Sequence, residues 1–198
     1  ILVSITIIGI GSTAALSVIS TSVRGNEAVH KRLIATNLAR EGLEVFINAR
    51  NQNIENANYA VEPKCWRALE IDTCSTSSEQ LWGELENDNE GYIDYVTYLD
   101  TETMEWTIDY SSNTYINTTP PPDFFRIYKS GDLYTNIPTD KETEFYRAVS
   151  VEELKNDTYG ETLGFSFEDG EVLKLTSIVY FKNRLNYSKV EANMIMSE

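Results

Sequence analysis

The first 23 residues of the sequence read ILVSITIIGIGSTAALSVISTSV and contain no aspartate, glutamate, lysine or arginine. As an α-helix rising about 1.5 Å per residue, this stretch would be roughly 35 Å long, which is enough to cross a bilayer. A cleaved signal peptide begins with basic residues and ends at a small-residue cleavage site, whereas this stretch runs on into further helical pattern. Residues 1–23 are therefore predicted to form a retained apolar helix, suited to a membrane or to the core of a fibre.

The apolar stretch is rich in glycine, serine and threonine, and such small residues let helices approach each other closely. Gly9 and Gly11 stand among β-branched residues, and each glycine lowers intrinsic helicity by about 1 kcal/mol relative to alanine. We therefore expect a local break of the helix near these two glycines. The alternative for the segment is an ordinary single-pass membrane anchor.

A helical pattern continues after Arg24 without a proline or a turn cluster, up to about Asn53. Apolar residues recur there at spacings of three, four and seven, while the charged residues lie mostly off this stripe. The stripe consists of Leu33, Ile34, Leu38, Leu43, Val45, Phe46 and Ala49. Residues 24–55 are therefore predicted to continue the helix as an amphipathic segment that packs one face on a sheet.

Acidic residues dominate the rest of the chain. The formal net charge is -15, and residues 1–53 hold five basic and three acidic groups, which leaves 11 basic and 28 acidic groups for residues 54–198. A head with this charge repels phosphate backbones and anionic lipids. We expect no contact between this head and nucleic acid.

Residues 56–198 are predicted to form a β-rich globular head. Period-two alternation, separated by turn residues, predicts strands at 92–99, 104–110, 125–129, 145–151, 172–181 and 187–196. The first two strands and the last two are each expected to form a hairpin. An antiparallel sheet packed on the second half of a long helix is an α+β fold.

No set of residues in the sequence points to catalysis, a cofactor or a metal. The single histidine, His30, falls on the predicted helix beside Lys31, and no Gly-x-Ser-x-Gly or phosphate-binding loop occurs. Residues 86–94 resemble the start of a calcium loop, but Thr97 stands where its bidentate glutamate should be. We expect a protein that is not an enzyme, with no cofactor and no bound metal.

Two kinds of modification are suggested by the head sequence. Cys65 and Cys74 lie nine positions apart in a polar stretch, which fits a disulfide-closed loop outside the cell or two free thiols in a reducing compartment. Asn-x-Ser/Thr sequons begin at Asn117, Asn156 and Asn186. Each is a possible glycosylation site if the asparagine is at the surface.

Residues 33–45 read LIATNLAREGLEV and follow an apolar segment with mid-helix glycines. Together they resemble the first helix of the type IV pilin-like proteins, the prepilin family that includes pilus subunits and secretion pseudopilins. Residues 145–151, which read FYRAVSV, and the late strand pair are similar to the sheet of one branch of that family. The resemblance covers about 50 residues of helix and, more loosely, about the last 55 residues.

The resemblance also implies how such a chain is processed. In the family, a peptidase removes a short basic leader before the apolar helix, and a glutamate near the new N-terminus offsets the free amine of a neighbouring subunit. Ile1-Leu2-Val3 looks like the sequence that directly follows this glutamate. We therefore expect the leader and the glutamate upstream of Ile1; the alternative is a natural departure from the family pattern.

By this resemblance, we expect a structural subunit of an extracellular filament, made first in the cytoplasmic membrane and then assembled by a pilus machine with copies of itself. The assembly residues are Ile1, Leu2, Val3, Ile7, Ile8, Gly9, Gly11 and Leu16. The alternatives are a minor pilin, a secretion pseudopilin or a membrane-anchored binding module. Motility, adhesion, DNA uptake and secretion stay open as roles.

We predict that Cys65 and Cys74 form a disulfide in the mature extracellular protein. The bridge would close a ten-residue loop and stabilise the fold by about 2–3 kcal/mol by constraining the unfolded chain. Thiol alkylation under denaturing, non-reducing conditions, followed by mass measurement, should label neither cysteine. Labelling of both would show free thiols instead.

Overall fold

The computed structural model describes the helix and the sheet of the chain. The described residues are 2–56, 65–67, 82, 92–100, 105–110, 115–138, 141–154, 172–183 and 186–197, without the side chains of Leu2, Asn56, Cys65, Tyr92 and Ile93. The chain divides into two compact units, residues 1–34 and residues 35–198.

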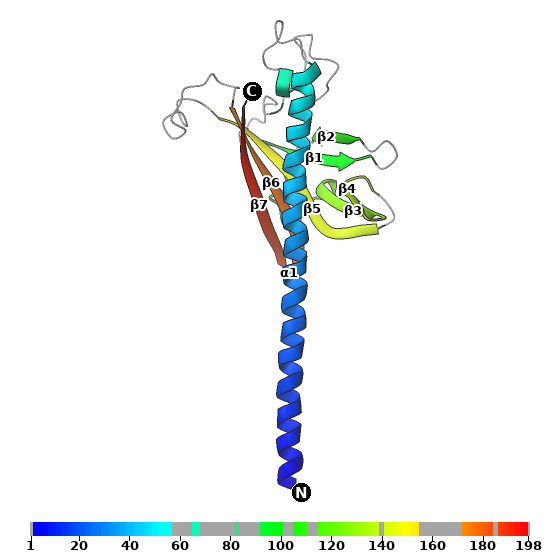
Figure 1. Ribbon diagram of the computed structural model, residues 1–198, viewed down its shortest axis with the longest axis vertical. Coiled ribbons are helices and arrows are strands. Elements are labelled where there is room, and N and C mark those ends of the chain that lie inside the picture. Colours follow the sequence, from blue (N-terminus) through cyan, green and yellow to red (C-terminus); the bar gives the residue numbers. More distant parts are fainter. Residues whose placement is uncertain are drawn as a thin grey trace. The chain divides into compact units, whose positions relative to one another are not determined.

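One helix, α1, begins at Leu2 and ends at Asn56 (Figure 1). It continues through Gly9 and Gly11, so the local break expected there is wrong for the single chain. Helix propagation is cooperative, since each added residue gains a hydrogen bond, and two glycines weaken a long helix without interrupting it. The extent of the helix agrees with the predicted stretch of residues 1–55.

The second unit contains a seven-stranded sheet in which every pair of neighbours is antiparallel. The strands are β1 (Tyr92–Leu99), β2 (Trp106–Tyr110), β3 (Arg126–Ser130), β4 (Leu133–Thr135), β5 (Lys141–Glu153), β6 (Val172–Asn183) and β7 (Asn186–Ser197). Two short 3-10 helices, η1 (Cys65–Arg67) and η2 (Asp123–Phe125), accompany them. The α+β fold predicted from the sequence is confirmed.

The sheet is forked. Strand β5 pairs along one edge with β6, which in turn pairs with β7. The other edge of β5 is shared, because its first half pairs with β3 and its second half with β1. β4 and β2 extend these two arms.

Both predicted hairpins are present, as β1–β2 and as β6–β7. The last pair is in register from Val172 opposite Ser197 to Asn183 opposite Asn186. The structure adds the short strand β4, which was not predicted, and it lengthens the strand expected at 145–151 to the 13 residues of β5. β4 pairs with β3 across the turn at Gly131, whose φ of 61° suits glycine.

The part of α1 that belongs to the second unit packs on one face of the sheet. Leu43 and Phe46 lie in a buried cluster with Tyr95. The Phe46 ring meets the Trp82 and Tyr95 rings edge to face, at centroid distances of 4.9 and 5.8 Å. Burial of a phenylalanine side chain contributes about 1.5–3 kcal/mol, so this cluster is a main source of helix–sheet stability.

The predicted apolar stripe is largely correct. Its fully buried members are Leu38, Leu43, Val45 and Phe46, and Ile34 and Ala49 are half-buried. Leu33 was assigned to the stripe wrongly, since 59% of it is exposed and it belongs to the first unit. Ala35 and Ala39 are completely buried but carry too little apolar surface to stand out in a periodicity.

Gly42 marks the closest approach of α1 to the sheet. A Cβ atom at this position would lie 2.8 Å from Ser177 Oγ, 3.1 Å from Val149 Cγ2 and 3.3 Å from Arg147 Cδ. Real side chains do not occupy such distances without displacing their neighbours. Glycine is therefore required here by space, and it lets the helix backbone lie directly on β5 and β6.

A second cluster covers the opposite face of the sheet. Its buried members are Val96, Ile116, Phe125, Tyr146, Ala148 and Ile178. The segment that carries Ile116 is fixed by Asp94, whose Oδ2 accepts a hydrogen bond from the Ile116 N–H at 2.8 Å. The sheet is thus enclosed by α1 on one side and by residues 116–125 on the other.

Replacing Gly42 with leucine should destabilise the second unit by about 3 kcal/mol, because the new side chain overpacks a filled contact. Urea unfolding followed by tryptophan fluorescence measures this, since Trp66, Trp82 and Trp106 all belong to the second unit. Gly25→Leu is the control, because a Cβ there meets nothing within 4 Å. An unchanged urea midpoint for Gly42→Leu would contradict the close approach.

Candidate assembly helix and its anchor in the head

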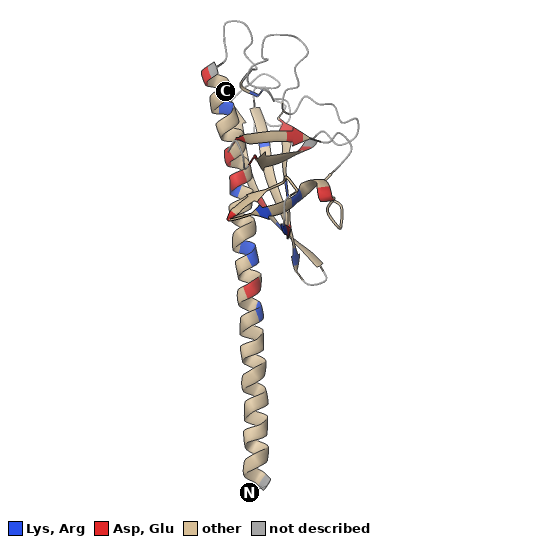
Figure 2. Ribbon diagram, turned by 90° about the vertical axis from the view of Figure 1, so that its right-hand side faces the viewer, with Lys and Arg blue, Asp and Glu red and all other residues tan. Residues whose placement is uncertain are grey.

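The described part of the apolar segment, residues 3–23, is exposed along its whole length. Ile7, Ile8 and Leu16 are 65%, 69% and 65% exposed, and Val3 is 70% exposed. Figure 2 shows the corresponding stretch of α1 without any charged residue. By length and composition alone, α1 could cross a membrane, and its exposed apolar surface is far larger than a soluble helix normally carries.

Four hydroxyl groups in this segment donate hydrogen bonds to the backbone of the helix itself. Ser12 Oγ donates to the carbonyl of Ile8 at 2.7 Å, and Thr21 Oγ1 donates to the carbonyl of Ser17 at 2.9 Å. Thr6 and Thr13 make the same kind of bond one turn back. A hydroxyl donor paired in this way can enter hydrocarbon or a protein contact without losing its hydrogen bond.

The two glycines open the helix surface. A Cβ atom built at Gly9 or at Gly11 meets nothing within 4 Å, so these glycines serve no packing contact among the described residues. Because glycine has no side chain, the helix backbone is exposed at these two positions, and another helix could pack close to it there. Gly42 differs from these two glycines, because it is required by a contact that already exists within the chain.

Arg147 of β5 ties α1 to the sheet. Its side chain is completely buried. Nη1 donates to Glu41 Oε1 at 2.6 Å, and Nη2 donates to the Thr97 carbonyl at 2.6 Å. Longer bonds of 3.4 Å reach the Leu38 carbonyl and Asn136 Oδ1. One guanidinium therefore joins the helix, β1 and the residue that follows β4.

The position of Arg147 is explained by the fork in the sheet. The β1–β5 ladder pairs Tyr95 with Val149 and, continued by two residues, would bring Thr97 opposite Arg147, but the ladder ends before that point. The guanidinium supplies the donor that the Thr97 carbonyl would otherwise lack, and a buried carbonyl without a donor costs about 1–3 kcal/mol. Further along β1, the Leu99 carbonyl also lacks a partner on β5, and it accepts a hydrogen bond from Thr135 Oγ1 at 3.0 Å.

The electrostatics of this anchor depend on Glu41. Burial lowers the pKa of the Arg147 guanidinium from its ordinary value, and the charge and hydrogen bond of Glu41 oppose that shift. Arginine keeps its proton in proteins, so the group is a buried cation. The guanidinium carbon lies 5.8 Å from the centre of the Trp106 ring, which adds a favourable cation–π interaction.

Several predicted site residues fall outside the described part of the chain. These are Ile1, Cys74 and Asn156, together with the side chains of Leu2 and Cys65. Asn117 and Asn186 are exposed, although Asn117 Oδ1 accepts a hydrogen bond from the Tyr180 hydroxyl at 3.3 Å. Of the calcium-like loop, residues 86–91 also lie outside, and the described Asp94 side chain is buried and bonded to Ile116.

The two stretches that carry the family resemblance meet in the structure. Glu41 and Gly42 come from residues 33–45, and Arg147 and Val149 come from residues 145–151. This pairing of the two stretches was not predicted from the sequence. The available signal was Arg147 itself, the charged residue in the mostly apolar predicted strand 145–151, since a buried cation needs a carboxylate partner.

Comparisons with protein-family models, with curated proteins and with solved structures gave no match. The class of protein is therefore defined by its own features. It is an α+β protein in which the second part of a long helix packs on a forked antiparallel sheet, while the first part is apolar, exposed and long enough to span a membrane.

Replacing Glu41 with glutamine should destabilise the second unit by about 2 kcal/mol. Removing one partner of a fully buried pair costs about 3–5 kcal/mol, and the Glu41 side chain is 36% exposed, which reduces the loss. Urea unfolding measures the change. Glu44→Gln, an exposed position on the same helix, is the control, and equal losses in the two variants would contradict the anchor.

Proposed function

We propose that this chain is a structural subunit of a type IV pilus-like filament, held in the cytoplasmic membrane by its N-terminal helix before assembly. The observation that carries the proposal is the division of α1 into two parts. One face of residues 35–54 is buried against the sheet, whereas the apolar residues 3–23 are exposed in the single chain. Such a surface needs an apolar environment, which a bilayer or neighbouring copies can supply.

The chemistry of the apolar segment suits both environments in turn. Four of its hydroxyls are bonded to its own backbone, so these donors keep their partners when the helix leaves lipid and enters a protein interior. Its bare positions at Gly9 and Gly11 allow a neighbouring helix to come close. Lipid solvation alone does not require either bare position.

In a filament under tension, the head of each subunit must also stay attached to its helix. The contacts suited to this are the Gly42 approach and the Glu41–Arg147 pair, which hold the second part of α1 on the central strand β5. In this proposal the function is packing, and no catalytic step is involved. The partners are copies of the same chain and an assembly machine.

A second candidate is a membrane-anchored binding module, whose helix stays in lipid. It is favoured by the length and apolar character of the helix, which meet the requirement for a single span. A minor pilin or a secretion pseudopilin would share all the features above. Electron microscopy of material sheared from cells separates the filament from the anchored module.

The double substitution Gly9→Leu, Gly11→Leu should leave membrane insertion intact, since leucine in a span is favoured by about 0.3–0.6 kcal/mol per residue. Filament yield should fall by about tenfold or more, because a close helix contact at these positions has no room for leucine. Insertion is measured by carbonate extraction of membranes, and yield by electron microscopy of sheared filaments.

The matched control is Ile5→Leu, Ile10→Leu, which places leucines at exposed positions outside the predicted assembly residues and leaves both glycines in place. It should insert and assemble as the parent does. Normal filaments from the glycine variant would contradict a close contact at Gly9 and Gly11. Absence of any filaments from the parent chain, together with stable membrane residence, would favour the anchored module.

A further inference from the structure

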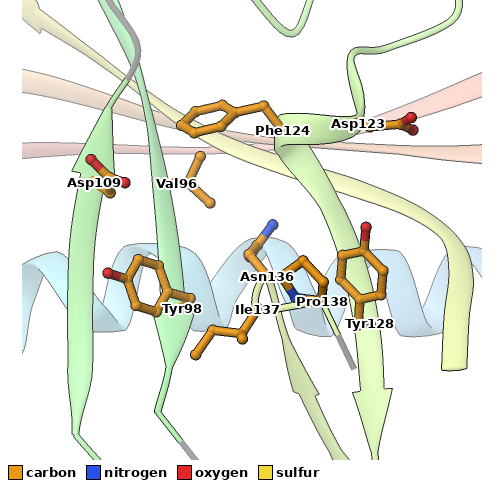
Figure 3. A pocket seen from close by; sticks show the side chains of 9 residues that line it. All are labelled: Val96, Tyr98, Asp109, Asp123, Phe124, Tyr128, Asn136, Ile137 and Pro138. Carbon is orange, nitrogen blue, oxygen red and sulfur yellow. The ribbon is translucent and has the colours of Figure 1, made fainter. Parts of the chain in front are cut away.

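A pocket of about 430 Å³ opens between the two arms of the forked sheet. Figure 3 shows α1 behind the strands and the pocket in front of them. Ile137 and Pro138 supply its apolar surface beside the buried Val96, and Tyr98, Phe124 and Tyr128 contribute aromatic rings from β1, η2 and β3. The volume is within the range of small-molecule and side-chain sites, roughly 300–1,000 Å³.

The pocket contains one carboxylate that is available to a ligand. Asp109 of β2 is exposed, and its Oδ1 accepts a hydrogen bond from the Tyr110 N–H at 2.7 Å. No bond to its Oδ2 is formed by the described residues. Asp123, the other carboxylate of the lining, is already held by Arg126, through Nε at 3.0 Å and through Nη2.

The amide group of the lining, that of Asn136, is already occupied. Asn136 Nδ2 donates to the carbonyls of Phe125 and Arg126, and its Oδ1 accepts from Arg147. The lining includes no lysine, arginine or histidine among the described residues. Its chemistry is therefore aromatic and apolar walls with one unneutralised negative charge, which is the environment that attracts an amphipathic cation.

The head already makes contacts of this kind internally. The Arg126 guanidinium lies 4.8 Å from the centre of the Tyr146 ring, and that of Arg147 lies 5.8 Å from the Trp106 ring. In both cases a carboxylate, Asp123 or Glu41, completes the contact. The pocket offers the same combination of ring and carboxylate without its own guanidinium.

We propose that this pocket binds an arginine side chain presented by a basic segment of another protein. The aliphatic stem would lie against Ile137 and Pro138, the planar guanidinium would stack on Tyr98, and Asp109 would accept its hydrogen bonds. Arginine is preferred to lysine because a guanidinium stacks on rings and pairs with a carboxylate in a fixed geometry. The pocket is larger than one side chain, so residues next to the arginine in the partner's segment would also occupy it.

The charge of the head supports a basic partner. Residues 54–198 carry 28 acidic against 11 basic groups, so a positively charged segment is attracted over the whole surface and held at the pocket. A second head of the same charge is disfavoured as the partner. The proposal does not depend on filament formation, and a chain that remains an anchored module would bind the same ligand.

The test measures binding of fluorescein-labelled Gly-Arg-Gly to the full chain in neutral detergent micelles at low salt, by fluorescence anisotropy. The comparison peptide is Gly-citrulline-Gly, which keeps the shape of arginine and lacks its charge. We expect the arginine peptide to bind at least about tenfold more tightly than the citrulline peptide. Only arginine carries the positive charge that interacts with the ring and with the carboxylate. This comparison uses the unaltered protein.

The variant arm uses Asp109→Asn, which removes the charge and keeps the shape of an exposed side chain. Its affinity for the arginine peptide should fall by about five- to tenfold, while Asp132→Asn, an exposed carboxylate on the β3–β4 turn, should change it less than about twofold. Equal binding of the two peptides, equal losses in the two variants, or no binding at millimolar peptide would each overturn the proposal.

Discussion

The buried guanidinium of Arg147 is the interaction on which the arrangement of the second unit depends. It lies where β1 and β3 separate along one edge of β5, and it donates to both the Thr97 carbonyl and the Glu41 carboxylate. A forked sheet leaves backbone carbonyls without ladder partners at the branch, and these must be satisfied because water is excluded. A long, multiply donating side chain meets that need from a single position.

Helix α1 has opposite requirements along its length. In residues 35–54 its apolar residues are spaced to fill one face of a sheet, and Gly42 brings its backbone against β5 and β6. In residues 3–23 apolar residues occur on all sides, and the hydroxyls of Ser12 and Thr21 are bonded to the helix backbone. The first pattern is met within the chain, whereas the second is met only by lipid or by other subunits.

The fork has a second consequence on the face away from α1. Because the β1–β2 arm and the β3–β4 arm diverge, the surface between them is left as a pocket lined from both. Asn136 connects the two sides, since it lines the pocket and also accepts a hydrogen bond from Arg147. The same branching that requires a buried cation on one side therefore creates a cavity on the other.

Sequence alone determined the long helix, its division into apolar and amphipathic parts, and the two hairpins, because each is encoded by local periodicity of 3.6 or 2 residues. It did not determine that Leu33 is exposed, that Ala35 and Gly42 are contact residues, or that Glu41 pairs with Arg147. Those facts depend on which residues 100 or more positions apart meet when β5 docks on the helix. Only the tertiary structure decided them, since a small residue or a charged residue shows its role through its neighbours and carries no periodic signal of its own.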